Sequence, residues 1–173
     1  MKGLGKLKQY AVSSDDILKA FNNNVKIVSY PELNNYSSID ELFGNFDACF
    51  ILYMTGFNSG HWCLLFRRDN YVEFFDPYGF IVDSQLNYAN PEYNGQKFPY
   101  LTKLLYTSPY KIHYNNHKLQ RSKKEVATCG RHCIFRYQNK NLSIDKYAKI
   151  LKEYKKYDLD ADDIVTLMTS NIK

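Results

Sequence analysis

The chain has 173 residues, which is enough for one folded domain and too few for two domains of ordinary size. Hydrophobic residues make up 45% of the sequence and charged residues 24%, which excludes a disordered tail, a collagen-like fibre and a disulfide-dense miniprotein. Basic residues outnumber acidic ones by 23 to 18, and this net charge of +5 permits contact with an acidic partner without requiring nucleic acid. We therefore predict a single domain spanning residues 1–173.

The sequence shows no recognisable targeting or membrane signal. The first ten residues lack the apolar core of a secretory signal. The longest apolar stretch, from Ala48 to Met54, is far shorter than a membrane span. The four cysteines are too few for a disulfide scaffold, and without a secretory signal they are expected to be free thiols. These features predict an intracellular or particle-enclosed protein with no membrane contact.

The first part of the chain predicts two short helices and one strand. Serine N-caps followed by acidic residues mark both helix starts, because a serine hydroxyl accepts a bond from a free N–H and acidic residues suit the first turn. β-branched residues mark the strand. The elements are a helix over 14–21 capped by Ser13, a strand over 25–28, and a helix from Ser38 to Gly44.

The middle of the chain is typical of β structure. The continuous apolar run over 48–54 predicts a strand buried on both faces. Runs over 61–67 and 71–75 flank Arg68-Asp69-Asn70, which predicts a hairpin. A short helix over 99–106 and an edge strand over 110–113 are predicted to follow.

From Cys129 onward, apolar residues recur at helical spacing. This pattern predicts a helix that begins at Cys129, a second helix capped by Ser143 and a third over 160–168. One face of the second helix is predicted to carry Tyr147, Ile150, Leu151 and Tyr154. Strands followed by helices indicate an α+β domain, in which helices pack on a central, mostly antiparallel sheet.

Three residues at the ends of predicted elements form a candidate catalytic group. Cys129 opens a helix, where free N–H groups and the helix dipole favour the thiolate. His61 begins one strand of the hairpin and Asp76 follows the other, so both lie at the same end of the pair. An imidazole can take the proton of a thiol, and a carboxylate can orient the imidazole. The combination predicts a thiol nucleophile that attacks a carbonyl group, with Gly130 leaving space beside the sulfur.

Short motifs surround these three residues in the order His, acid, Cys. They are Gly60-His61-Trp62, Phe74-Phe75-Asp76-Pro77-Tyr78-Gly79 and Thr128-Cys129-Gly130-Arg131-His132-Cys133. Together they resemble the adenain-like viral maturation cysteine proteases of adenovirus, virophage and polinton type, which share a clan with the SUMO- and ubiquitin-like-protein-specific proteases. The resemblance covers roughly residues 45–138 and implies the adenain-like fold, with the nucleophile at the N-terminus of a helix.

Transferred residue by residue, the resemblance implies Cys129 as nucleophile, His61 as general base and Asp76 as the acid that orients it. The acid is glutamate in adenain and aspartate in the SUMO-protease branch. Adenain's peptide activator is tethered by a disulfide, whereas the matching segment here, 108–112, has no cysteine. The resemblance therefore implies no required cofactor and leaves DNA or an untethered peptide open as an activator.

Further site residues follow from the same resemblance. Gln120 matches the glutamine that donates to the oxyanion, with the amide of the nucleophile as second donor. The loop after Gln120 is slightly longer than in the family, which leaves Asn115 and Asn116 as alternative donors. Trp62 is expected to cover the histidine and, with Gly130, to shape the substrate cleft.

The implied function is that of a cysteine endopeptidase cleaving capsid or other structural precursor proteins during particle maturation. Such a protein would act as a monomer in the virion or in the host-cell cytoplasm. The triad alone leaves open a protease that removes a ubiquitin- or SUMO-like modifier. The short chain, a minimal catalytic domain, favours the viral type.

Two other interpretations rest on other residues. A zinc site would use His113, His117, Cys129 and Cys133, but the spacing of the cysteines is wider than in a zinc knuckle, and zinc would leave the other motifs unexplained. A nucleic-acid-binding module would use the basic segments 118–124 and 152–156 with their neighbouring tyrosines. Basic segments of this kind are usually a solvated face, which argues against a nucleic-acid-binding module. With both alternatives disfavoured, we predict an enzyme without a metal.

Overall fold

The computed structural model describes residues 2–57, 59–92 and 95–172 and confirms the α+β class. Its sheet has the strand order β1-β2-β3-β4-β5. The strands are β1 (Lys26–Ser29), β2 (Ala48–Gly56), β3 (Ser59–Arg68), β4 (Tyr71–Phe75) and β5 (Lys111–Tyr114). The centre of the sheet, β2 to β4, is antiparallel as predicted, whereas both edge strands run parallel to their neighbours. The sheet is therefore mixed.

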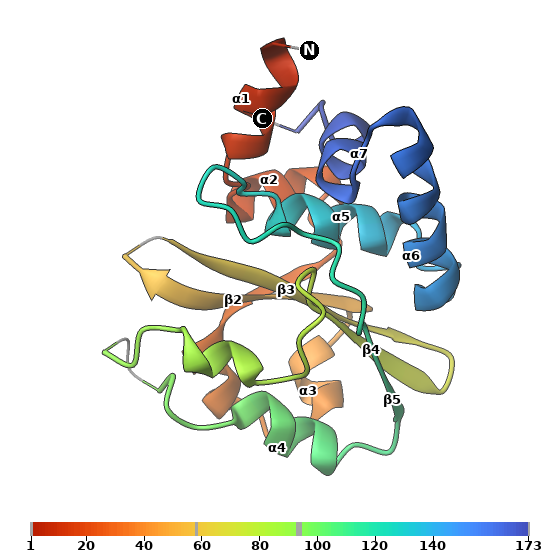
Figure 1. Cartoon of the computed structure of the whole chain (residues 1–173). Helices are drawn as coiled ribbons and strands as arrows, with labels where there is room; N and C mark the ends of the chain where they lie inside the picture. The colour runs from red at the N-terminus through yellow and green to blue at the C-terminus, as the bar shows by residue number, and fades with distance from the viewer. Residues whose placement is uncertain (1, 58, 93–94, 173) are drawn as a thin grey trace.

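Helices cover both faces of this sheet, as Figure 1 shows. One layer holds α1 (Lys2–Gln9), α2 (Ser14–Ala20), α5 (Cys129–Gln138), α6 (Ile144–Glu153) and α7 (Ala161–Met168). The other holds η1 (Tyr30–Asn35), α3 (Ile39–Phe43) and α4 (Tyr100–Tyr106). Two short 3-10 turns, η2 (Ser84–Asn87) and η3 (Tyr154–Tyr157), complete the described elements.

Strand β2 is buried from both sides, as its continuous apolar sequence predicts. Phe50 packs into the core under α5 and α6, while Cys49 and Ile51 pack into the core under α3 and α4. Because successive side chains of a strand point to opposite faces, a strand covered on both faces has no polar alternation. The two cores therefore share this one sheet.

The β3–β4 hairpin places one end of each strand at the same edge of the sheet. Leu64 pairs with Phe75, and the turn at Asp69 has a positive φ of 51°. Asp76 follows immediately after β4, and His61 lies three residues before Leu64 on β3. The expected proximity of His61 and Asp76 is thus a consequence of the hairpin register.

Helix α5 lies across β3 and begins at Cys129, as predicted. Gly130 allows this close approach, because a Cβ there would lie 2.9 Å from Val12 Cβ and 3.1 Å from Trp62 Cδ1. Farther along the helix, the buried Arg136 guanidinium makes two 2.8 Å hydrogen bonds to the Glu73 carboxylate on β4. These contacts hold the first turn of α5 above the start of β3.

The N-terminal helix α1 has no strong sequence signal and was not among the predicted elements. It contains Gly3 and Gly5, which are poor helix formers, and it packs on α7, where Lys8 Nζ lies 2.6 Å from Asp163 Oδ1. Ile150 of α6 and Tyr154, the first residue of η3, are exposed rather than part of the predicted apolar face. Among the described residues, no helix combines the length and apolar character needed to cross a bilayer.

Candidate active site

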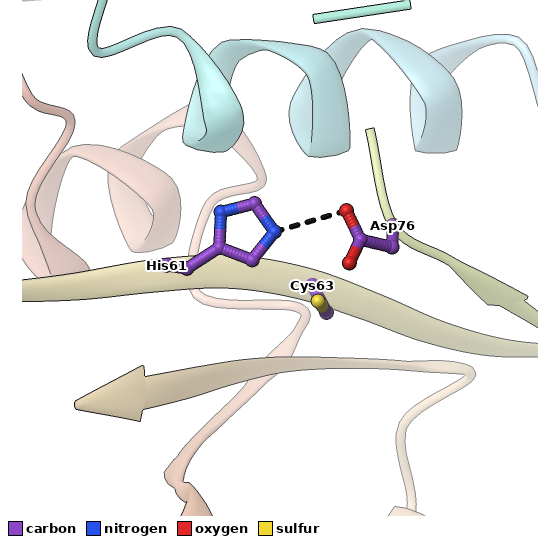
Figure 2. A group of neighbouring side chains, drawn as sticks. All are labelled: His61, Cys63 and Asp76. Carbon is purple, nitrogen blue, oxygen red and sulfur yellow. Dashed lines mark hydrogen bonds and ion pairs between the residues drawn. The ribbon is translucent and has the colours of Figure 1, made fainter. Parts of the chain in front are cut away.

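The structure brings His61, Asp76 and Cys129 together from β3, the end of β4 and the start of α5. His61 Nε2 lies 3.0 Å from Asp76 Oδ1. Because Asp76 engages Nε2, the other ring nitrogen, Nδ1, faces the first turn of α5 (Figure 2). The His61 side chain also hydrogen-bonds with Cys129. The three groups thus form one row, sulfur to imidazole to carboxylate.

Asp76 is fully buried, and its carboxylate is held by several donors. Besides His61, the Tyr78 backbone N–H donates to Oδ1 at 2.7 Å, and the Gln85 side-chain amide donates to Oδ2 at 2.5 Å. The Asn115 amide donates to the Asp76 backbone carbonyl at 2.6 Å. A buried carboxylate with this many partners stays in one orientation.

Electrostatics in the row favour an imidazolium beside a thiolate. Burial lowers the pKa of His61, but hydrogen bonds to Asp76 and Cys129 and their charges more than offset it and raise the pKa to about 9. Burial raises the pKa of Cys129, yet the hydrogen bond and charge of His61, with the backbone N–H groups of Trp62 and Gly130, hold it below its usual range. A thiol with a lowered pKa beside a protonated imidazole is an activated nucleophile.

A cavity of about 830 Å³ opens over this row. His61 and Cys129 line it, together with residues of the N-terminal segment, the β2–β3 hairpin and the loop before α5. The Tyr78 ring stacks on His61 at 4.8 Å between centroids, and Tyr88 meets the imidazole edge-on at 6.1 Å. Aromatic rings therefore wall the imidazole and limit its contact with water.

Of the remaining predicted site residues, Trp62 and Gln120 line this cavity and Gly130 does not. Trp62 lines it, with its indole N–H donating to the Val12 carbonyl at 3.0 Å. Gln120 also lines it, and its backbone N–H donates to Pro77 O at 2.9 Å. Gly130 instead packs between Val12 and Trp62, so it shapes the cleft through that close approach and is not itself among the lining residues.

The two alternative oxyanion donors differ from Gln120. Asn115 is buried and spends its amide N–H groups on the carbonyls of Asp76 and His117. Neither Asn115 nor Asn116 lines the cavity, whereas Gln120 does. Among these three candidates, the structure therefore places only Gln120 at the cavity.

A buried network around Asp162 of α7 fixes the loop between Gln120 and Cys129. The Asp162 carboxylate accepts bonds from Thr128 Oγ1 at 2.5 Å and from His132 Nε2 at 3.0 Å. Its second oxygen accepts the Arg121 backbone N–H at 3.0 Å. One carboxylate thus holds the residues next to Gln120 and to Cys129.

Comparison with known proteins gives one informative result. No family model matches the chain. The sequence is 38% identical over 174 residues to the uncharacterized protein V9 of Sputnik virophage, covering 98% of this chain and 99% of that protein. The chain belongs to the V9 family. This viral relative supports the predicted viral origin, and it assigns no chemistry to the V9 family.

The other three cysteines of this V9-family chain are buried, as predicted for packing thiols. Burial raises the pKa of Cys49 to about 12 and holds the pKa values of Cys63 and Cys133 well above the usual thiol value. Cys129, by contrast, is only half-buried and has a lowered pKa. The electrostatic environment therefore separates one reactive thiol from three inert ones.

The predicted alternative of a four-ligand zinc site does not assemble. His113 stacks on Tyr71, and His117 Nε2 lies 2.7 Å from Asp145 Oδ1. Within the described residues, a different group has metal-ligand geometry, namely His61, Cys63 and Asp76 (Figure 2). Within this group, His61 Nε2 and Asp76 Oδ1 are already paired at 3.0 Å.

Sequence reasoning missed several residues around the row. Gln85 and Tyr88 come from a long segment after β4 that has little periodicity, and Val12 comes from the N-terminal segment. Asp162 lies within the predicted helix over 160–168, but its contacts with Thr128 and His132 were not predicted. The motif around Asp76 contains Tyr78, and this aromatic residue beside the candidate acid was the available sequence signal for the ring that stacks on His61.

Proposed function

We propose that this V9-family protein is a cysteine endopeptidase that cleaves capsid or other structural precursor proteins during particle maturation. The observation that carries the proposal is the row of Cys129, His61 and Asp76, of which Cys129 and His61 line an open cavity, with the sulfur at a helix N-terminus. A lowered thiol pKa and a raised imidazole pKa within that row are the electrostatic state that a cysteine protease needs.

The chemistry proceeds in two steps. The Cys129 thiolate attacks the carbonyl carbon of the scissile bond, and the oxyanion is stabilised by the Cys129 backbone N–H and the Gln120 side chain. The tetrahedral intermediate collapses as His61 gives its proton to the leaving amine, which leaves a thioester on Cys129. Water then attacks the thioester with His61 as base, and the carboxylic acid product and the thiolate are released.

The surroundings of the cysteine indicate which substrates fit. The Trp62 ring and the Val12 side chain pack closely on the first turn of α5, and a residue larger than Gly130 would clash with both. Because Trp62 and Val12 also line the cavity beside Cys129, we propose that they leave little room for a side chain there and favour glycine on one side of the scissile bond. The viral relative supports a viral setting, and structural precursors of the same particle are the substrates that we propose in that setting.

The direct test uses the purified protein and the structural proteins encoded with it. Each is incubated with the wild type, with Cys129→Ala and with His61→Ala, and products are identified by intact mass and N-terminal sequencing. We expect discrete cuts with the wild type and none with either variant. Cuts that persist in Cys129→Ala would reject the proposed nucleophile.

A second substrate class separates the two kinds of protease. Ubiquitin and SUMO carrying a C-terminal fluorogenic amide report deconjugating activity. We expect no release from either modifier at enzyme concentrations that cleave a structural precursor. Rapid release from a modifier, with no cut in any structural protein, would replace particle maturation by deconjugation as the function.

A further inference from the structure

Gln85 is a fully buried polar residue that the proposed mechanism does not use. It lies on η2, in the segment between β4 and α4, and its side chain is 0% exposed. Its amide N–H donates to Asp76 Oδ2 at 2.5 Å. Its Oε1 atom is buried and has no hydrogen-bond partner among the described residues.

This half-satisfied amide is unfavourable for folding by itself. Burying a carbonyl oxygen without a partner loses its hydrogen bonds to water, and an apolar residue of similar size would avoid that loss. Gln96, by comparison, is nearly as buried, and both ends of its amide are bonded, to the Met54 backbone and to Asn90 O. The benefit of glutamine at position 85 must therefore come from its one bond, which goes to Asp76.

That bond fixes the plane of the carboxylate. Oδ1 accepts from His61 and from the Tyr78 backbone, and Oδ2 accepts from Gln85. The Cys63 thiol also hydrogen-bonds with Asp76, but a thiol is a weak donor. Without the Gln85 amide, rotation about the Cβ–Cγ bond would therefore be less restrained and would lengthen the bond to His61. The backbone carbonyl of Gln85 accepts the backbone N–H of Tyr88 at 3.2 Å, and the Tyr88 ring borders the same imidazole.

We propose that Gln85 is a positioning residue that holds the Asp76 carboxylate in the orientation in which Oδ1 faces His61 Nε2. Gln85 does not touch substrate and acts only through Asp76. The consequence for peptide cleavage rests on the proposed function, whereas the consequence for the thiolate on Cys129 does not. Reactivity of the thiolate is therefore the readout.

The titratable groups that face the imidazole–carboxylate pair are few. Cys129 faces it from α5, Cys63 from β3, and the tyrosines at 78 and 88 from the segment after β4. Cys63 keeps its proton, and burial raises the pKa values of both tyrosines, so these three groups stay neutral near pH 6.5. At that pH, a change in thiolate reactivity reports the His61–Asp76 pair.

The experiment measures alkylation of Cys129 by limiting iodoacetamide at pH 6.5, with the site identified by peptide mass spectrometry. Gln85→Met keeps the side-chain volume and removes the donor, and we expect a rate about tenfold below that of the wild type. Gln96→Met is the matched control, and its rate is expected to stay within about twofold of the wild type. Equal rates for Gln85→Met and the wild type would overturn the proposal.

The route through Asp76 is tested by combining variants. In an Asp76→Asn background, Gln85→Met is expected to change the alkylation rate by less than about twofold, because the group that it positions is already altered. A tenfold effect that persists in this background would overturn the proposal.

A near-isosteric variant covers the case in which Gln85→Met does not fold. In Gln85→Glu, the two adjacent carboxyl groups share one proton, because like charges at this distance do not both ionise, so the new side chain still donates to Asp76 Oδ2. We expect its rate at pH 6.5 to remain within about threefold of the wild type. A tenfold loss in folded Gln85→Glu would contradict the proposal, and neither result depends on finding a peptide substrate.

Discussion

Removing the negative charge of Asp76 is expected to lower the pKa of His61. In the native protein that pKa is raised to about 9, although burial by itself would lower it. Asp76→Asn keeps the size of the side chain and removes an opposite charge whose oxygen lies 3.0 Å from Nε2. Because an opposite charge at such a distance shifts a pKa by roughly 1–3 units, burial is then opposed by Cys129 alone, and the pKa of His61 falls by that amount.

This shift predicts how much of the protonated imidazole is lost. For a fall of about 2 units, the imidazolium fraction at pH 8 drops from about nine-tenths to about one-tenth. Proton donation to the leaving amine needs the imidazolium, so kcat at pH 8 is expected to fall about tenfold from this effect alone. At pH 6 the two proteins would differ less, because both retain much of the proton.

Histidine NMR measures this titration directly. The chain has four histidines, so the carbon-bound ring signals of a ¹³C-histidine-labelled sample can be assigned with single His→Ala variants. We expect the His61 signal to titrate near pH 9 in the wild type and at least one unit lower in Asp76→Asn. A midpoint within about 0.3 units of the wild type would refute the assignment of Asp76 as the charge that holds the imidazolium.

Three further outcomes follow from the same structure. The pH dependence of kcat/KM is expected to be bell-shaped, rising through the lowered pKa of Cys129 and falling near pH 9 as His61 loses its proton; a rate still rising at pH 10 would contradict this. Gly130→Ala is expected to lose activity and about 1–3 kcal/mol of stability in urea unfolding, because its Cβ has no space; wild-type activity would show that the first turn of α5 shifts freely. Glu73→Gln leaves the Arg136 charge buried, so we expect a loss of about 3–5 kcal/mol and a Tm lower by roughly 6–20 °C, measured by calorimetry; a change under about 2 °C would mean that the pair is solvated.

The sequence was sufficient to place the row because each member lies at the end of an element with a strong local signal. The hairpin around Asp69 has a fixed register, and that register brings the start of β3 beside the end of β4. Cys129 opens a helix whose apolar periodicity is clear. The hairpin pattern therefore placed His61 near Asp76, from which it is separated by 15 positions in the sequence.

The parts that sequence reasoning could not supply depend on long-range packing. The parallel pairing of β1 with β2, and of β4 with β5, is decided by connections that cover the faces of the sheet. Gln85 lies in a segment whose shape is set by side-chain bonds to Asp76 and by Asp83 contacts with buried tyrosines. No periodic pattern marks such a segment, because its partners are distant residues.

Two buried carboxylates define the two sides of the site, and they act on different parts of it. Asp76 holds the imidazole from the sheet side, and its own orientation depends on donors from the segment after β4. Asp162 holds the loop from Arg121 to Thr128 from the helical side, through α7. Because Cys129 follows Thr128 and Gln120 precedes Arg121, Asp162 positions the proposed nucleophile and oxyanion donor, whereas Asp76 positions the proposed proton carrier. The row therefore depends on how closely α5 packs on the sheet and on the N-terminal segment, and at position 130 a Cβ would lie 2.9 Å from Val12 Cβ and 3.1 Å from Trp62 Cδ1.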